Sequence, residues 1–135
     1  MAGCATALRA LSPHCVFIGV EPDRADDTRR SIEAGEIVQL DSVETIADGL
    51  AVLRPGDNTF AINRRLVSQV LTVAEDAFVD AMAFAMDELD EVVEPSGAAA
   101  LAALLNSGKR WSGKRIGIVL SGGNADTDKF PEVFG

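Results

Sequence analysis

Residue types that react as nucleophiles, bind metals or stack on bases are scarce in this sequence of 135 residues. It has no tyrosine, one tryptophan, one histidine and two cysteines. The histidine, His14, follows Ser12-Pro13 in an expected surface turn, so no Ser–His or Cys–His pair is available for nucleophilic catalysis. Cys4 and Cys15 lack the spacing of a zinc knuckle or a disulfide framework. We expect both to be buried small residues in a reducing compartment, which favours the cytoplasm.

Positive charge is missing from a long stretch of the chain. No lysine or arginine occurs between Arg65 and Lys109, and the net charge of the whole chain is −9. A surface of this sign repels the phosphates of nucleic acids and of anionic lipids, so we predict neither as a partner. No run is long and apolar enough to cross a bilayer, and the N-terminus lacks the order of a secretory signal peptide.

Apolar residues are abundant instead, and they are mostly aliphatic. They make up 47% of the chain, which is long enough for one compact domain. Residues 15–20 and 116–120 are continuously apolar, which is typical of strands buried on both faces, and residues 70–73 favour a third short strand.

Helical patterns alternate with these runs. Residues 1–11 are rich in helix formers, and residues 25–34 end at Gly35, a common C-terminal stop. We interpret Thr72 and Glu75 as a capping box at the start of a third helix with an apolar stripe.

A fourth, alanine-rich helix is expected from Ser96 to about Leu105, after Pro95 breaks the third. Residues 49–58 are predicted to be a loop, because Arg54-Pro55-Gly56-Asp57 is a turn signal. Strands that alternate with helices predict an α/β fold: an open, mostly parallel sheet with helices on both faces, incomplete as given.

Two segments have polar groups where such a sheet binds ligands. Ser121-Gly122-Gly123-Asn124 follows a predicted strand, and ligands bind beyond the carboxyl ends of parallel strands. A tight turn explains this motif equally well. Glu94 stands just before a helix start, either as part of an ordinary capped helix or as a carboxylate near a polar ligand.

A third segment has two carboxylates around a strand-to-helix turn. Glu21 ends the expected strand and Asp27 lies one turn into the next helix. With a backbone carbonyl between them they could hold Mg²⁺ or Ca²⁺. Acids that cap a helix and complement its dipole are the commoner explanation.

Six segments in order resemble the threonine/serine dehydratase and serine racemase family, pyridoxal-phosphate (PLP) dependent enzymes of the tryptophan-synthase β-like fold, fold type II. No single motif decides this, but the order of the six is specific and covers nearly the whole chain. The chain is similar to the C-terminal portion of the catalytic domain over residues 1–135. The segments are residues 2–11, 19–22, 25–27, 45–49, 94–98 and 121–124.

The resemblance implies cofactor-binding roles. Ser121 matches the serine whose hydroxyl meets the pyridine nitrogen of PLP, in a motif that includes Gly122. Glu94 matches a carboxylate close to the cofactor, and Gly49 matches a glycine packed near the ring. A neutral hydroxyl at the nitrogen makes the ring a moderate electron sink, adequate for loss of a β-hydroxyl.

The resemblance also implies a divalent-cation site for Mg²⁺ or Ca²⁺. Glu21, Ala25 and Asp27 match the ligands of the racemase-like members, and Ala25 contributes its carbonyl. This favours the metal interpretation over simple helix capping. Asn124 matches a position that contacts ATP in some members, although the acidic residues before Glu94 argue against ATP control.

The chain departs from the family where catalysis is concerned. The lysine that carries the cofactor lies far upstream in the family, and Lys109, Lys114 and Lys129 stand in polar C-terminal contexts. We therefore expect no catalytic residue in this segment. The tetraglycine phosphate loop would precede Met1, and no regulatory domain is expected after Asn124.

The resemblance implies a fragment of a PLP-dependent ammonia-lyase that converts L-threonine or L-serine into a 2-oxo acid and ammonia. The full-length protein is expected to be a homo-oligomer and the isolated chain to be inactive. Two alternatives remain: a serine racemase-like enzyme fragment, and a non-catalytic protein of the same fold that binds an ion or a partner.

Overall fold

A small parallel sheet lies at the centre of the computed structural model, which describes residues 1–135. β1 (Ile18–Pro22) pairs with β2 (Gln69–Val73), with Val20 opposite Leu71. Parallel strands need a long crossover connection, and α2 (Asp27–Ala34) and α3 (Asp57–Leu66) lie in it. A 3₁₀ turn, η1 (Asp48–Leu50), lies between the two helices.

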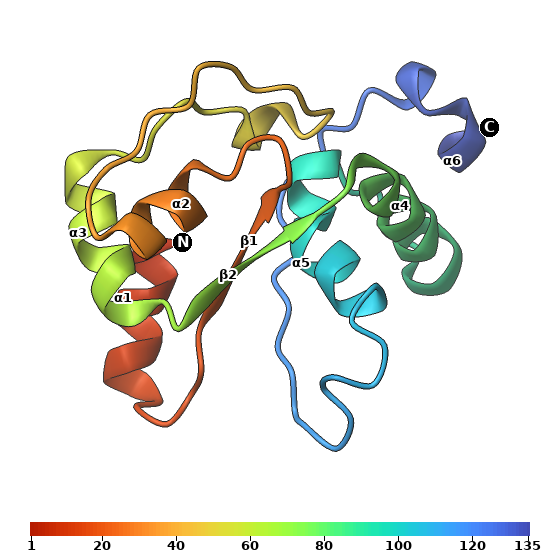
Figure 1. Cartoon of the computed structure of the whole chain (residues 1–135). Helices are drawn as coiled ribbons and strands as arrows, with labels where there is room; N and C mark the ends of the chain where they lie inside the picture. Colours follow the sequence, from red (N-terminus) through yellow and green to blue (C-terminus); the bar gives the residue numbers. More distant parts are fainter.

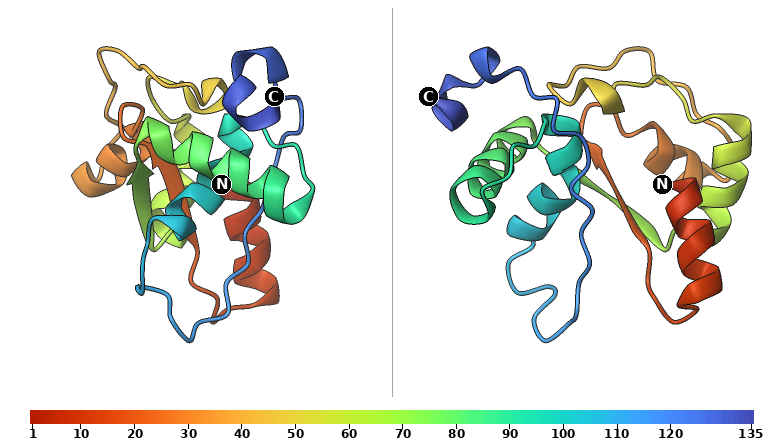
Figure 2. Two further views of the ribbon diagram at one scale, coloured as in Figure 1. Left: turned by 90° about the vertical axis from the view of Figure 1, so that its right-hand side faces the viewer. Right: turned by 180° about the vertical axis from the view of Figure 1, so that it is seen from behind.

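Helices cover both faces of this sheet (Figure 1). α1 (Ala2–Leu11), α2 and α3 lie on one side, and α4 (Glu75–Leu89) and α5 (Pro95–Leu105) lie on the other. The view from behind shows the same separation (Figure 2). The predicted α/β fold, with an open parallel sheet and helices on both faces, is confirmed.

The main apolar core lies between α4, α5 and the sheet. Phe78 and Met82 are fully buried there, together with a group of alanines. The predicted stripe on α4 is therefore confirmed over its first three turns. It fails at Leu89 and Val92, which are 47% and 41% exposed. Asp90 adopts a left-handed conformation with φ 56° and ends the helix before Val92.

The alanine-rich helix α5 is buried around most of its circumference. It begins at Pro95, one residue earlier than expected, and Glu94 rather than Ser96 is its N-cap residue. Proline suits the first helical position because its missing N–H would have no partner there. Pro95 thus starts α5 and does not end α4.

Two expectations about helix boundaries are wrong. α3 was not expected, because residues 57–66 are mostly polar and the structure buries only Phe60 and Asn63 among them. The capping box is also absent: Thr72 lies within β2, and Ala74 is the N-cap residue of α4 without a side-chain cap.

Residues 116–120 do not form the predicted strand. This segment runs alongside α5 (Figure 1) and makes no ladder hydrogen bonds with β1 or β2. Ile118 and Leu120 pack against the core, whereas Val119 is 69% exposed. Alternation of this kind gives one buried face, which is less than the apolar run suggested.

The cysteines are exposed, so the expectation that they are buried is wrong. α1 turns Ala2 and Ala5 inward and leaves Cys4 outside, while Cys15 lies in the connection before β1. After residue 122 the chain forms η2 (Thr127–Lys129) and α6 (Pro131–Phe134), which packs on α4. No helix has both the length and the apolar character needed to cross a membrane.

Candidate functional site

Three segments that are far apart in the sequence meet at the N-terminus of α5. The backbone N–H of Glu94 donates a hydrogen bond to the carbonyl oxygen of Gly122, at 2.9 Å. The N–H of Gly49 donates to Oγ of Ser96, also at 2.9 Å. The start of α5 therefore ties together residues 45–49 and the Ser121–Gly122 turn.

Glycines make this close approach possible. A Cβ atom on Gly97 would lie 1.5 Å from the carbonyl oxygen of Ser121. A Cβ atom on Gly122, whose φ is 79°, would lie 2.3 Å from Oε1 of Glu94. Side chains at these two positions would push the Ser121–Gly122 turn away from the helix.

A hollow of about 290 Å³ adjoins this cluster. The Ser121–Gly122 turn forms part of its wall, and the Ser121 side chain is exposed. A hydroxyl, a half-buried carboxylate from Glu94 and the free N–H groups of a helix N-terminus are hydrogen-bonding groups for a polar, flat ligand. The hollow is lined by Glu91, Val92, Val93, Leu120, Ser121, Gly122 and Gly123.

The lysines lie in solvent, outside this cluster. Lys109 and Lys114 are exposed in the turns that follow α5. Lys129 is exposed as well and pairs with Asp126 at 3.1 Å. None of them is held at the cluster around Glu94, which agrees with the absence of a predicted catalytic residue.

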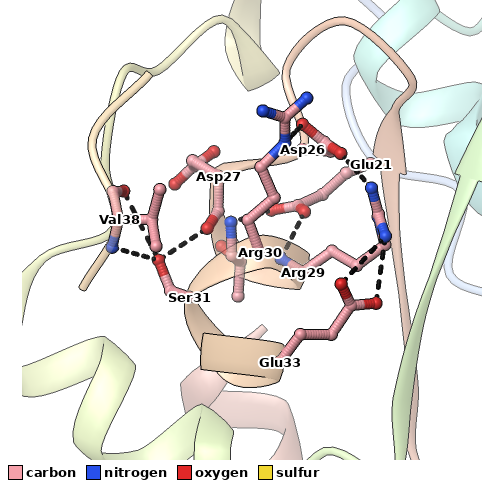
Figure 3. A network of polar contacts seen from close by, with 9 residues as sticks. Glu21, Asp26, Asp27, Arg29, Arg30, Ser31, Glu33 and Val38 are labelled. Carbon is pink, nitrogen blue, oxygen red and sulfur yellow. Dashed lines mark hydrogen bonds and ion pairs between the residues drawn. The ribbon is translucent and has the colours of Figure 1, made fainter. Parts of the chain in front are cut away.

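A second polar cluster lies where β1 runs into α2 (Figure 3). Glu21, at the end of β1, is buried and accepts hydrogen bonds from the backbone N–H groups of Thr28 and Arg29, at 3.2 and 2.9 Å. These are first-turn amides of α2, which have no partner inside the helix. Burial nevertheless raises the pKa of Glu21 above its ordinary value.

Asp26 is held by arginines of the same helix (Figure 3). Its carboxylate pairs with Nε of Arg30 at 2.7 Å and with the guanidinium of Arg29. Burial works to raise the pKa of Asp26, but the hydrogen bonds from Arg29 and Arg30 lower it overall. Asp26 is therefore a compensated charge.

Asp27 is the uncompensated carboxylate of this cluster. It is 1% exposed, and both of its carboxylate oxygens are buried without a hydrogen-bond partner. Burial and, second, the negative charge of Glu21 raise the pKa of Asp27 from 3.8 to about 6. Ala25, the third predicted ligand, is fully buried in the same turn. The structure contains no group of three or more His, Cys, Asp or Glu side chains that could hold a metal.

The structure thus brings Glu94, Gly49, Ser121 and Gly122 into one cluster and Glu21, Ala25 and Asp27 into another. Asn124 makes no hydrogen bond with either. The sequence interpretation missed Ser96 and Gly97 as parts of the first cluster. The only signal for them is the Pro-Ser-Gly sequence at a helix start, which is common in purely structural joins.

Comparison with known families identifies the fold and the site together. Residues 1–122 match the family described as pyridoxal-phosphate dependent enzyme. The chain belongs to this family. The match to the pyridoxal-phosphate dependent enzymes covers every residue of both clusters.

Curated relatives of this family member include ammonia-lyases and racemases. L-threo-3-hydroxyaspartate ammonia-lyase of a Pseudomonas species is 44% identical over 133 residues, which cover 98% of this chain and 42% of that protein. Serine racemase of Schizosaccharomyces pombe is 37% identical over 96% of this chain and 40% of that protein. The chain therefore spans less than half the length of these relatives.

Solved structures of the family agree with this. A threonine deaminase from the organism abbreviated T.th. superposes with a TM-score of 0.87 at 46% identity, over 93% of this chain and 46% of that one. Maize serine racemase gives the same TM-score at 40% identity, over 97% of this chain and 41% of that one. The chain is a partial representative of a PLP-dependent ammonia-lyase or racemase fold.

Proposed function

We propose that this chain forms the cofactor-ring side of a PLP-dependent ammonia-lyase that converts L-threonine or L-serine into a 2-oxo acid and ammonia. The observation that carries the proposal is the convergence of Glu94, Gly49 and the Ser121–Gly122 turn on the N-terminus of α5. The residues that fit the cofactor are its four predicted ligands.

Bound PLP withdraws electrons from the α-carbon of an amino-acid substrate. The hydroxyl of Ser121 would donate a hydrogen bond to the ring nitrogen and keep that end of the ring neutral. Gly49 and Gly122, which have no side chains, would let the flat ring approach the backbone closely. The carboxylate of Glu94, held at the helix start, would keep water and other anions from the ring edge.

We expect the isolated 135-residue chain to release no ammonia or 2-oxo acid from L-threonine or L-serine in the presence of PLP. None of its lysines is placed at the cluster around Glu94, so none can carry the cofactor. The measurement is a coupled assay of the 2-oxo acid on the purified chain. Lys129→Arg, Lys114→Arg and Lys109→Arg variants are the controls if any activity is found.

The same assay on the full-length protein, expressed with the coding sequence upstream of Met1, tests the proposal itself. A reading frame that encodes a lysine segment and a glycine-rich loop, with PLP-dependent release of ammonia, supports an ammonia-lyase. Formation of D-serine from L-serine without 2-oxo acid supports the racemase alternative, which the 37% identity to a serine racemase also favours. A stop codon directly before Met1 would leave only a non-catalytic role.

We also propose that Glu21, the carbonyl of Ala25 and Asp27 hold Mg²⁺ or Ca²⁺. Two buried carboxylates with raised pKa values, one of them without any hydrogen bond, are what a hard cation would satisfy. The arginines nearby are already paired with Asp26, so they leave this charge in place.

Without divalent cations, we expect Asp27→Asn to stabilise the chain at pH 7 by up to about 3 kcal/mol. The pKa of Asp27 is raised in the folded state, so its contribution to stability is complete below about pH 4 and is lost as pH rises through about 6. Urea unfolding at pH 4.5 and pH 7 checks this. Asp23→Asn, a change at an exposed acid just after β1, is the matched control.

Addition of Mg²⁺ or Ca²⁺ at pH 7 is expected to raise the Tm of the wild-type chain and to leave that of Asp27→Asn unchanged. Equal shifts in both proteins would count against the cation site.

We further propose a homo-oligomer in the cytoplasm that has no nucleic-acid or membrane partner. Two free cysteines and a net charge of −9 support a reducing location and weigh against polyanionic partners.

A further inference from the structure

Glu75 makes a contact that neither its helix nor the proposed ligand set explains. Oε2 of Glu75 accepts a hydrogen bond from the backbone N–H of Ile46 at 2.7 Å, across 29 residues of sequence. Glu75 is the first residue of α4, yet it does not cap that helix. Its side chain instead leaves α4 to bond the segment that contains Gly49.

The other carboxylate oxygen of Glu75 makes this arrangement costly. Oε1 is buried and has no hydrogen-bond partner. A buried acceptor without a partner works against folding, so a pure stability role is poorly served by this side chain. The nearby helix N-terminus favours a negative charge here, and a charged acceptor strengthens the bond to Ile46.

Residues 45–49 are pinned at three points. Ile46 is tied to α4 through Glu75, Ala47 is fully buried in the core, and Gly49 is tied to α5 through Ser96. Ser96 and Glu75 belong to different helices and hold the segment from two sides. If the bond to Glu75 is lost, the segment keeps only the burial of Ala47 and the attachment that Ser96 provides at its far end.

We infer that Glu75 is a positioning residue, which holds residues 45–49 where Gly49 can border the cofactor ring. This inference rests on the proposed function, because it concerns the face that would meet PLP. Glu75 touches neither the ring position nor the substrate in this arrangement and acts only through the backbone of Ile46.

Amide hydrogen exchange on the 135-residue chain tests the hold directly. In Glu75→Ala, the amides of Ile46 and Gly49 are expected to exchange about tenfold faster, while those of Ala81 in α4 stay unchanged. Glu75→Gln keeps an acceptor oxygen and should stay within about threefold of wild type.

Asp76→Ala is the matched control for Glu75→Ala. It removes the same charge from the same helix turn, but Asp76 bonds only the N–H of its neighbour Ala77. Unchanged exchange at Ile46 in Glu75→Ala overturns the inference. So does a rise of equal size at Ile46 and Ala81, since that marks a general loss of stability.

A second measurement, PLP affinity of the full-length protein by cofactor fluorescence, tests what the hold is for. Glu75→Ala is expected to weaken PLP binding about five- to tenfold, with Glu75→Gln and Asp76→Ala close to wild type. Wild-type affinity in Glu75→Ala, despite faster exchange at Ile46, overturns the role toward the cofactor and leaves the proposed function intact. If the wild-type protein binds no PLP, both the proposed function and this role are wrong.

Discussion

Gly97→Ala is expected to destabilise the chain by about 1–3 kcal/mol and to loosen the Ser121–Gly122 turn from α5. The new methyl group would lie 1.5 Å from the carbonyl oxygen of Ser121, so backbone must move on one side or the other. The buried position of Gly97 in the first turn of α5 offers no space for the helix to retreat. The loss falls on the segment that carries two proposed cofactor contacts.

The direction of this effect is informative because replacing glycine by alanine inside a helix ordinarily gives the opposite result. A methyl group added to Gly3, in α1, would have nothing within 4 Å of it. Gly3→Ala is therefore expected to stabilise the chain by about 0.5–1 kcal/mol through the lower backbone entropy of alanine. Urea unfolding of both variants under one condition gives the comparison.

Amide exchange at Gly122 and Gly123 locates the damage. A fall in stability with unchanged exchange in this turn would mean that α5 itself yields and that the turn stays in place. Equal stabilisation by Gly97→Ala and Gly3→Ala would contradict the close approach altogether. In the full-length protein, we expect Gly97→Ala to weaken PLP binding along with stability.

The helices of the apolar half of the chain were the easiest elements to predict. The stripe with Phe78 and Met82 has the period of one buried helix face, and both side chains are fully buried. α3 was missed because its burial depends on α1 and α2, which pack against it, and not on its own polar sequence. Local pattern predicts a helix only when the apolar residues of that helix make most of its contacts.

The predicted strand at residues 116–120 failed for a related reason. An apolar, β-branched run favours an extended chain, and the segment is extended beside α5. Strand formation also requires a neighbour with free N–H and C=O groups, and propensity says nothing about where that neighbour lies. The extended conformation was thus predictable, whereas the pairing was not.

The candidate site was predicted as a set of residues but not as a geometry. Family resemblance named Glu94, Gly49 and Ser121, and each is a weak signal on its own. Their contacts pass through partners that no motif marks, namely Ser96, Gly97 and the backbone of Gly122. These are backbone and hydroxyl groups, which carry no distinctive sequence pattern.

The second cluster shows how burial changes a prediction. From sequence alone, Glu21 and Asp27 favoured ordinary helix capping. Glu21 does accept two first-turn amides of α2, so that interpretation is correct for one of the two. Asp27 caps nothing, and its buried, unpartnered oxygens make it the unusual group. Position in the sequence offered no means of separating the two carboxylates.

Gly122→Ala is expected to destabilise the chain by about 2 kcal/mol and to displace the carboxylate of Glu94. Two effects add. Alanine in the left-handed region costs about 1–2 kcal/mol, and Gly122 has φ 79°. The methyl group would also lie 2.3 Å from Oε1 of Glu94, which must then leave its place beside the turn.

A double-mutant cycle separates these two effects. Glu94→Ala removes the side chain that the methyl group meets, so Gly122→Ala in that background should cost only the left-handed conformation, about 1 kcal/mol. Gly117→Ala is the control in the same C-terminal segment, because Gly117 has open space and no positive φ. A Gly122→Ala cost that is the same in both backgrounds would show that Glu94 does not pack against the turn. A smaller cost without Glu94 would mean that this carboxylate and the Gly122 backbone form one unit, as a shared cofactor contact requires.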